Sequence, residues 1–545
     1  MRLALVVMGM LIGAWQTSAC AQAGPAPGTV PPAPVAPAAE TIPLSLGEAI
    51  SIGIENNTDV EIVRYDPPIA EYDYEAAWGV HDPVLFGDYR YTSQKLPVAS
   101  AFFPSQFIER DSVGDAGLRG LLPKLGWTYQ LAYTGQDVQT NSIVQSLGTT
   151  YTSNLTATVV APLLRGAWWG AAWTQVEFTG IGSELALEQF REQLTEIVSG
   201  IETGYWNLAA TKQNLEVANK SLETSRALLD QTKAQYEVGV VSRVEVTEAE
   251  AGVATREFNQ IRDLNFYHAA QDDLIDRVYG PRLTPTSRLE IEPTDKPEDY
   301  VTFELDPEAS TQRALERRPE LIIARQRVEQ NEILLKFAKN ERLPQLDAVG
   351  SYGTHGLSGN DPNCPLGQAL AGTCPVPNPP TQPPGIGTDY ADNDDFWFDG
   401  NKNRVWSAGA VVSIPIPNTT ARSNVRIQEL ELRRAKTVVR RTEQDIVKDV
   451  RDAVRNLASA LEGVEAAERG VVASTEQLRA ERIRLEHGES TPFDVLLREE
   501  SLVTAESQKI TALRIYRGSV TALDRAQGTL LEDRSIVLED ALPLR

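Results

Sequence analysis

A helical pattern that occurs twice is the feature that most constrains the fold of this chain. Leucine and other apolar residues recur at every seventh position in two stretches that lie 249 residues apart. Heptads sustained over several turns indicate long helices that pack side by side as in a coiled coil. The positions are Leu208, Leu215, Leu222, Leu229 and Tyr236 in the first stretch, and Leu457, Val464, Val471, Leu478 and Leu485 in the second.

Each of these stretches ends in a similar short turn, YEVGVVSRVEV in the first and LEHGESTPFDV in the second. A glycine stands where a helix ends, because a residue there commonly adopts positive φ. A serine or threonine follows as the N-cap of the next helix, with an acidic residue three positions later. The pattern predicts two helical hairpins of equal reach, with turn residues Gly239 and Ser242 in one and Gly488 and Thr491 in the other.

A second correspondence runs through the chain at an offset of 261 residues and pairs Pro83 with Pro344 and Tyr91 with Tyr352. In both copies a helical pattern ends before the proline, and an alternating, strand-like segment follows. We therefore expect two internal repeats, each with a helix, strands and a long helical hairpin. Repeat 1 is expected at 44–300 and repeat 2 at 301–530, with a long loop at 357–403 and a C-terminal tail at 531–545.

The N-terminal residues are typical of export. An apolar run after Arg2 and small residues around Cys20 predict a signal peptide over 1–21. A flexible leader rich in Pro and Ala is expected over 22–43. Lipidation of Cys20 is the alternative to cleavage after residue 21. In an exported protein, the remaining cysteines, Cys364 and Cys374, are expected to form a disulfide, with two free thiols as the alternative.

Charge and motifs exclude several function classes. The chain has 75 acidic and 51 basic residues, a formal charge of −24, so nucleic acid is not an expected partner. The four histidines are far apart, and neither a P-loop nor an HExxH or G-x-S-x-G motif occurs. We therefore expect no enzymatic activity, no cofactor and no metal site.

The duplicated motif Gly-x-x-(Ser/Thr)-x-x-(Asp/Glu)-Val resembles the periplasmic tip of the TolC family of outer-membrane efflux channel proteins. The segment EAISIGIENNTDVEIVRYDPPIAEYDYEAAWGVHDPVL is similar to that family's first helix and its entry into the barrel, and APLLRG (161–166) and VSIPIPN (412–418) are similar to its strand-to-helix junctions. The resemblance covers roughly residues 44 to 530.

This resemblance implies an α+β membrane protein. Three protomers would share one β-barrel in the outer membrane, continuous with a long antiparallel α-helical barrel in the periplasm. The implied function is the passive exit duct of a tripartite efflux or type I secretion system for small molecules or proteins. Its implied partners are a periplasmic adaptor protein, an inner-membrane pump and outer-membrane lipid. The alternative hypothesis is a periplasmic coiled-coil adaptor or scaffold.

The number of strands stays open between four and six per protomer. Strands are expected at 345–356 and 404–416 in the second half. In the first half, 83–94 and 150–162 are expected strands, and 112–122 and 125–138 form either an extra hairpin in the barrel or a folded loop outside it. A trimer would accordingly hold 12 or 18 strands.

The resemblance also implies roles for particular residues. Asp494 stands where the family commonly carries an acidic ring at the inner constriction, and Glu245 is its counterpart in repeat 1. Each also occupies the third position of a capping box, which is a sufficient structural reason for a carboxylate. Glu499 and Glu500 are candidates for a second ring. The tryptophans expected at the lipid–water interface, with packing between sheet and helices as the alternative, are Trp168, Trp169 and Trp173.

Overall fold

The computed structural model describes residues 40–97, 106–140, 147–284, 289–300, 306–362 and 403–538. The expected signal peptide, nearly all of the leader, and the cysteines Cys20, Cys364 and Cys374 lie outside these ranges.

The two halves of the chain carry related elements in the same order. The first half contains β1 (Glu40–Leu44), α1 (Leu46–Asn56), α2 (Thr58–Val63), α3 (Asp66–Trp78), β2 (Val84–Pro97), β3 (Gln106–Leu121), β4 (Thr128–Thr140), β5 (Leu147–Pro162), α4 (Ala171–Glu237) and α5 (Arg243–Tyr279). The second contains β6 (Leu289–Pro293), α6 (Pro307–Arg317), α7 (Pro319–Glu341), β7 (Gln345–Pro362), β8 (Arg404–Ser413), α10 (Thr419–Glu486), α11 (Pro492–Gln527) and α12 (Leu530–Asp533).

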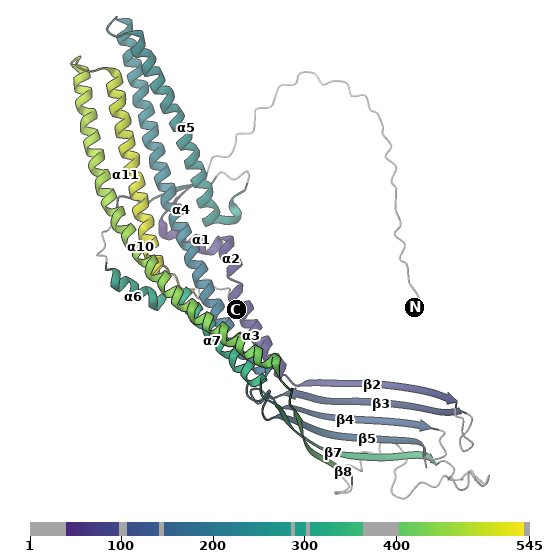
Figure 1. Ribbon diagram of the computed structural model, residues 1–545. Helices are drawn as coiled ribbons and strands as arrows, with labels where there is room; N and C mark the ends of the chain where they lie inside the picture. Colours follow the sequence, from purple (N-terminus) through teal and green to yellow (C-terminus); the bar gives the residue numbers. More distant parts are fainter. Residues whose placement is uncertain are drawn as a thin grey trace, which may run out of the picture.

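Two helical hairpins, α4–α5 and α10–α11, dominate the molecule. Helices α4 and α10 have 67 and 68 residues, which at about 1.5 Å per residue gives rods of roughly 100 Å. In Figure 1 all four helices run together, and both hairpin turns lie at the end opposite the sheet. The heptad positions supply part of the packing, since Leu208, Leu222, Leu457 and Val464 are buried, whereas Tyr236 near the turn is exposed.

The strands form one antiparallel sheet in the order β2-β3-β4-β5-β7-β8, which extends from the lower end of the helices (Figure 1). The pairing of β5 with β7 joins the two halves of the chain. Strands β3 and β4 lie in the middle of this sheet, so the hypothesis that 112–138 is a loop outside it is wrong. The other alternative, an extra hairpin formed by these two segments, matches the antiparallel pairing of β3 with β4. Strand β7 also extends to Pro362, which shortens the expected loop at 357–403.

A small parallel sheet of β1 and β6 lies beside the helices and changes two expected boundaries. Residues 40–43 were expected to belong to a flexible leader, but Glu40–Leu44 pairs with Leu289–Pro293. The Tyr205 hydroxyl donates to the carbonyl of Leu44 at 3.0 Å and fixes this strand to α4. At the other end, Leu530 and Leu531 are buried in the core of the first half, so the segment expected to be a tail from residue 531 begins as packed structure.

The hydrophobic core is divided between the halves of the chain. In the first half, α4 and α5 contribute Phe190, Leu194, Tyr205 and Leu274, all at most 1% exposed. In the second half, α10 and α11 contribute an equivalent cluster, Ile446, Val450, Leu513 and Tyr516. None of the helices in the described ranges is both long and apolar enough to cross a lipid bilayer.

Candidate functional site

The first hairpin turn closes α4 with a Schellman motif. The Gly239 N–H donates to the carbonyl of Tyr236 at 2.9 Å, and the Val240 N–H donates to that of Gln235 at 2.9 Å. These bonds satisfy carbonyls that a helix end leaves unpaired. They require the left-handed conformation at Gly239, whose φ is +80°.

The second hairpin turn has the same hydrogen bonds 249 residues later. The Gly488 N–H donates to the carbonyl of Leu485 at 3.0 Å, the Glu489 N–H donates to that of Arg484 at 2.9 Å, and φ of Gly488 is +77°. His487 adds a contact between its Nδ1 and the carbonyl of Ile483 at 2.8 Å. Both hairpins therefore reverse direction through one local geometry.

Capping boxes start the returning helices. The Ser242 hydroxyl accepts from the Glu245 N–H, and the Glu245 carboxylate accepts from the Ser242 N–H at 3.2 Å. In the second turn, Asp494 Oδ2 accepts from the Thr491 hydroxyl at 2.7 Å and from the Thr491 N–H at 3.2 Å. These bonds from Thr491 lower the pKa of Asp494, with Arg484 and Arg498 contributing charge. Asp494 and Glu245 are thus ionisable groups at the tip whose capping role is visible in the structure.

A small apolar cluster holds the two hairpins together just behind the turns. It contains Leu228 of α4, Leu478 of α10, and Val495 and Leu496 of α11. Gly252 lets α5 approach the same cluster, because a Cβ atom at this position would lie 3.2 Å from Leu496 Cδ1. The four helices therefore remain in contact close to the tips.

Glu481 organises the second tip, a role that the sequence pattern did not reveal. The residue is 7% exposed, and its carboxylate accepts from the Ser490 hydroxyl at 2.6 Å. Arg484 and Arg498 lie 3.4 Å and 3.7 Å from its oxygens. Glu481 thus bridges the end of α10, the turn and the start of α11. An acidic residue in a helix rich in Glu and Arg carries no local signal that would distinguish this position.

Glu499 differs from the expectation that it belongs to a second acidic ring. Only 4% of the residue is exposed, and it lies between the hairpins near Arg256 of α5 and Arg482 of α10. A carboxylate in this position is enclosed by helices. Glu500, the next residue, is exposed.

The six-stranded sheet has one apolar and one polar face near its helical end. Directly paired residues lie on the same face of an antiparallel sheet. One continuous row across all six strands is apolar: Leu85, Leu118, Leu131, Ala157, Tyr352 and Trp406. A row on the opposite face of the first five strands is polar: Asp88, Asp115, Thr134, Asn154 and His355.

The apolar row is open to the surroundings of the single chain. Leu85 is 81% exposed and Trp406 is 73% exposed. On the polar face, the Thr134 hydroxyl donates to Asp115 Oδ1 at 2.5 Å. A sheet with these two faces can lie between an apolar and an aqueous medium.

The three tryptophans at the junction of sheet and helices have different surroundings. Trp173 packs edge to face on Trp78, with ring centroids 5.8 Å apart. The Lys336 Nζ atom lies 4.9 Å from the centroid of the Trp169 ring. Trp168 is 56% exposed. Only Trp168 is thus directed largely to the surroundings, while Trp169 and Trp173 also make contacts within the chain.

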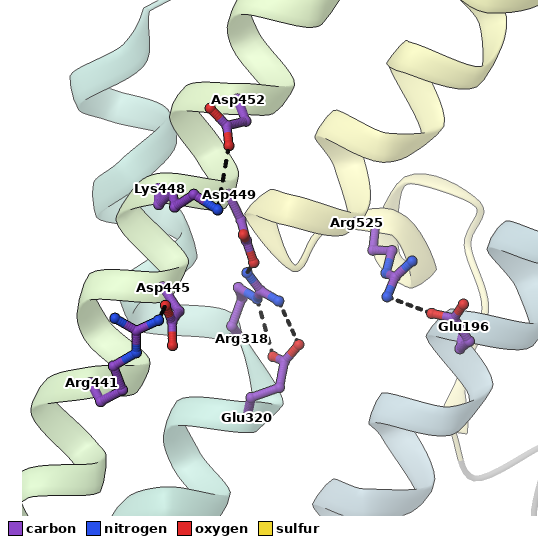
Figure 2. Close-up of polar contacts among 9 residues, drawn as sticks. All are labelled: Glu196, Arg318, Glu320, Arg441, Asp445, Lys448, Asp449, Asp452 and Arg525. Atoms are coloured by element: carbon purple, nitrogen blue, oxygen red, sulfur yellow. Dashed lines mark hydrogen bonds and ion pairs between the residues drawn. The ribbon is translucent and has the colours of Figure 1, made fainter.

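Ion pairs connect the elements between the sheet and the tips (Figure 2). Arg318, at the start of α7, bonds to Glu320 at 2.6 Å and to Asp449 of α10 at 3.2 Å. Arg525 of α11 pairs with Glu196 of α4 at 2.5 Å. The buried Arg318 therefore links the short helix pair of the second half to its long hairpin. In the part of the chain that the structure describes, no group of three or more His, Cys, Asp or Glu residues could hold a metal ion.

A model of the family described as outer membrane efflux protein matches residues 115–276 and 311–529 of this chain. These two segments include most of the sheet and both long hairpins. Among curated protein sequences, no significant match is found.

Solved structures with the same fold cover nearly the whole chain. A membrane protein from Pseudomonas aeruginosa matches with a TM-score of 0.63 and 17% identity, covering 89% of this chain and 90% of that one. The CmeC outer membrane channel of Campylobacter jejuni matches with a TM-score of 0.59 and 14% identity, covering 92% of this chain and 90% of that one. The MtrE outer membrane channel of Neisseria gonorrhoeae, in its open state, matches with a TM-score of 0.60 and 16% identity, covering 89% of each chain. At these identities the likeness is one of fold.

Proposed function

The chain belongs to the outer membrane efflux protein family, and on this premise we propose that it forms the exit duct of a tripartite export system. The family match over both hairpins and most of the sheet is the observation that carries the proposal. The protein is an outer-membrane efflux protein by this membership.

In the proposed assembly, three copies close one β-barrel. Within the described residues, β2 pairs only with β3 and β8 pairs only with β7, so the sheet has two edges. Strand edges expose unpaired backbone groups, which lipid cannot satisfy, and joining the edges of neighbouring copies removes them. Three sheets of six strands give eighteen. The apolar row that contains Leu85 and Trp406 would face lipid, and the polar row that contains Asp88 and Asn154 would face the lumen.

The helical hairpins of the three copies would form the periplasmic tube, with the tips at its inner mouth. Three copies of Asp494 and Glu245 would place up to six carboxylates around this opening. Rings of carboxylates favour cations over anions. Because each carboxylate also caps a helix, its pore role has to be tested separately from its structural role.

The partners in this proposal are a periplasmic adaptor protein and an inner-membrane pump. The duct itself would be passive, and the pump would supply the energy and select small molecules or proteins as cargo. The exposed Trp168 would lie at the lipid–water interface, where aromatic rings are favoured. Trp169 and Trp173 would lie just beneath it and support the junction through their contacts with Lys336 and Trp78.

Single-channel recordings of the purified full-length protein in planar bilayers test the duct and its mouth together. Wild-type protein is expected to produce discrete conductance steps with a preference for cations. In Asp494→Asn, the cation-to-anion permeability ratio is expected to fall several-fold, because three negative charges leave the mouth. A protein that never inserts and stays soluble without detergent would contradict the duct.

Thr491→Ala is the matched control for the capping role of Asp494. It removes the hydroxyl that Asp494 binds at 2.7 Å but keeps the carboxylate. Both variants disturb the same capping box, at a cost of about 1 kcal/mol. If the ratio falls in both variants equally, the effect is structural and Asp494 is only a helix cap.

A further inference from the structure

Glu499 occupies the place where all four hairpin helices meet. It projects from α11 among Thr224 of α4, Arg256 of α5 and Arg482 of α10. The residue is 4% exposed, and its Oε2 atom has no hydrogen-bond partner among the described residues. A buried carboxylate oxygen without a partner is costly. Its presence between two hairpins calls for an explanation in terms of their relative position.

The carboxylate borders a cleft of about 490 Å³ between the hairpins. The cleft wall combines apolar side chains, including Leu478 and Leu502, with charged groups of both signs. The charged groups around Glu499, arranged by helix, are Lys220 of α4, Arg256 of α5, Arg479, Arg482 and Glu486 of α10, and Glu506 of α11.

Two opposing influences act on this carboxyl group. Burial favours its neutral form and raises its pKa, whereas the charges of Arg256 and Arg482 oppose the rise. Burial is the larger influence. Arg256 is itself held in place, because its Nη2 donates to the Leu496 carbonyl at 3.4 Å. The packed arrangement of the hairpins therefore binds a proton on Glu499 more readily than an arrangement in which water reaches this side chain.

We propose that Glu499 is an acid-sensitive latch between the two hairpins, which favours their packed arrangement when it is protonated and their separation when it is ionised. A neutral carboxyl group can remain among Leu478, Leu502 and the arginines at low cost. An ionised group gains by hydration, which requires the hairpins to move apart at the cleft. Acid would thus bring the two hairpin tips closer together, and a rising pH would move them apart.

The consequence for transport rests on the proposed function. If the tips form the inner mouth of a duct, acid in the surrounding compartment would narrow that mouth. The latch itself is a property of the hairpins, so it can be tested by distance as well as by conductance.

The test measures the separation of the two tips as a function of pH. Spin labels on non-canonical side chains at Val238 and Glu489, both exposed and one beside each turn, report the distance by double electron–electron resonance. In the full-length protein in detergent, the distance distribution is expected to shift to longer values as the pH rises through the raised pKa of Glu499, above the ordinary range of a glutamate. In Glu499→Gln, which is neutral at every pH, the short distances are expected throughout. Glu500→Gln, at the exposed neighbouring residue, is expected to behave as wild type.

A second variant tests the same proposal without removing the carboxylate. Arg482→Gln removes a cation that lowers the pKa of Glu499, so the transition is expected to move to higher pH. Retention of the full pH response in Glu499→Gln, or a shift to lower pH in Arg482→Gln, would overturn the latch. Absence of conductance steps in bilayers would count against the duct alone, because the distance measurement needs no pore.

Discussion

Arg534 and Glu202 are 332 residues apart in sequence and form a two-point contact. Arg534 Nε donates to Glu202 Oε1 at 2.5 Å, and Nη2 donates to Oε2 at 3.2 Å. The Thr521 hydroxyl donates to the same carboxylate at 2.6 Å. Glu202 is fully buried in α4, so these donors offset the cost of enclosing its charge. The C-terminal segment is thereby fixed to the core of the first half.

Arg534→Met should destabilise the protein strongly. It leaves Glu202 buried without its cationic partner, a loss of about 3–5 kcal/mol in comparable sites. Thermal unfolding of the detergent-solubilised protein measures the effect. Arg525→Met is the matched control, because the Arg525–Glu196 pair is exposed on both sides and such pairs contribute about 0–1 kcal/mol. Equal losses in the two variants would contradict the role of the Glu202 contact.

Asp524 should make stability depend on pH. Burial raises its pKa to about 6, although Arg534 at 3.4 Å opposes the rise. At pH values between the ordinary pKa of an aspartate and this raised pKa, the folded protein binds a proton at Asp524 more tightly than the unfolded chain does. Stability should therefore increase as the pH falls through this window, by at most about 3 kcal/mol. In Asp524→Asn this contribution should vanish, and a series of melting curves against pH checks it. An unchanged slope in the variant would contradict the assignment.

Gly488→Ala should destabilise the second tip by about 1–2 kcal/mol. Its φ of +77° is unfavourable for any residue with a Cβ atom, even though the site has open space around it. Gly470→Ala, in the interior of α10, is the control, because a Cβ atom there also meets nothing within 4 Å. That substitution should be neutral or stabilising by up to about 1 kcal/mol. Hydrogen exchange of the amides near the turn distinguishes the two variants and should be faster only in Gly488→Ala. Faster exchange in Gly470→Ala would contradict this prediction.

Glu481→Leu should loosen the turn between α10 and α11. The substitution removes the acceptor of the Ser490 hydroxyl and leaves Arg484 and Arg498 without this carboxylate, at a cost of about 1–3 kcal/mol. Limited proteolysis at the second tip should accelerate, while the first tip stays unchanged. Glu486→Leu, at an exposed position five residues later, serves as control. Equal acceleration in both variants would show that the Glu481 contacts are dispensable.

The sequence predicted the helix ends and starts at the two hairpin turns, because each depends on a motif of only a few neighbouring residues. Gly239 and Gly488 mark helix ends because few other residues adopt positive φ, and Ser242 and Thr491 mark helix starts because their hydroxyls pair with backbone N–H groups. The two heptad stretches lie within the long helices α4 and α10, as the seven-residue spacing predicts. The number of strands stayed open because alternation alone does not distinguish a barrel hairpin from a folded loop.

The features that the sequence did not reveal depend on contacts between distant residues. From its composition, the segment of β1 is expected to belong to the Pro-rich leader. It forms a strand because it pairs with β6, which is distant in sequence. Glu202, Glu481 and Glu499 are three of many acidic residues on charged helices, and their burial depends on which helix faces them. No periodicity within one helix encodes the position of Arg534 or Arg256.

A cryo-electron microscopy map of the purified full-length protein in lipid nanodiscs tests the central claim most directly. The account predicts three copies around one axis, with a single closed ring of eighteen strands in the membrane, six from each copy, in which β2 of one copy pairs with β8 of the next. The two hairpin turns of every copy should lie together at the far end of the helical tube. Single copies with open sheets, or a ring that excludes β3 and β4, would contradict it.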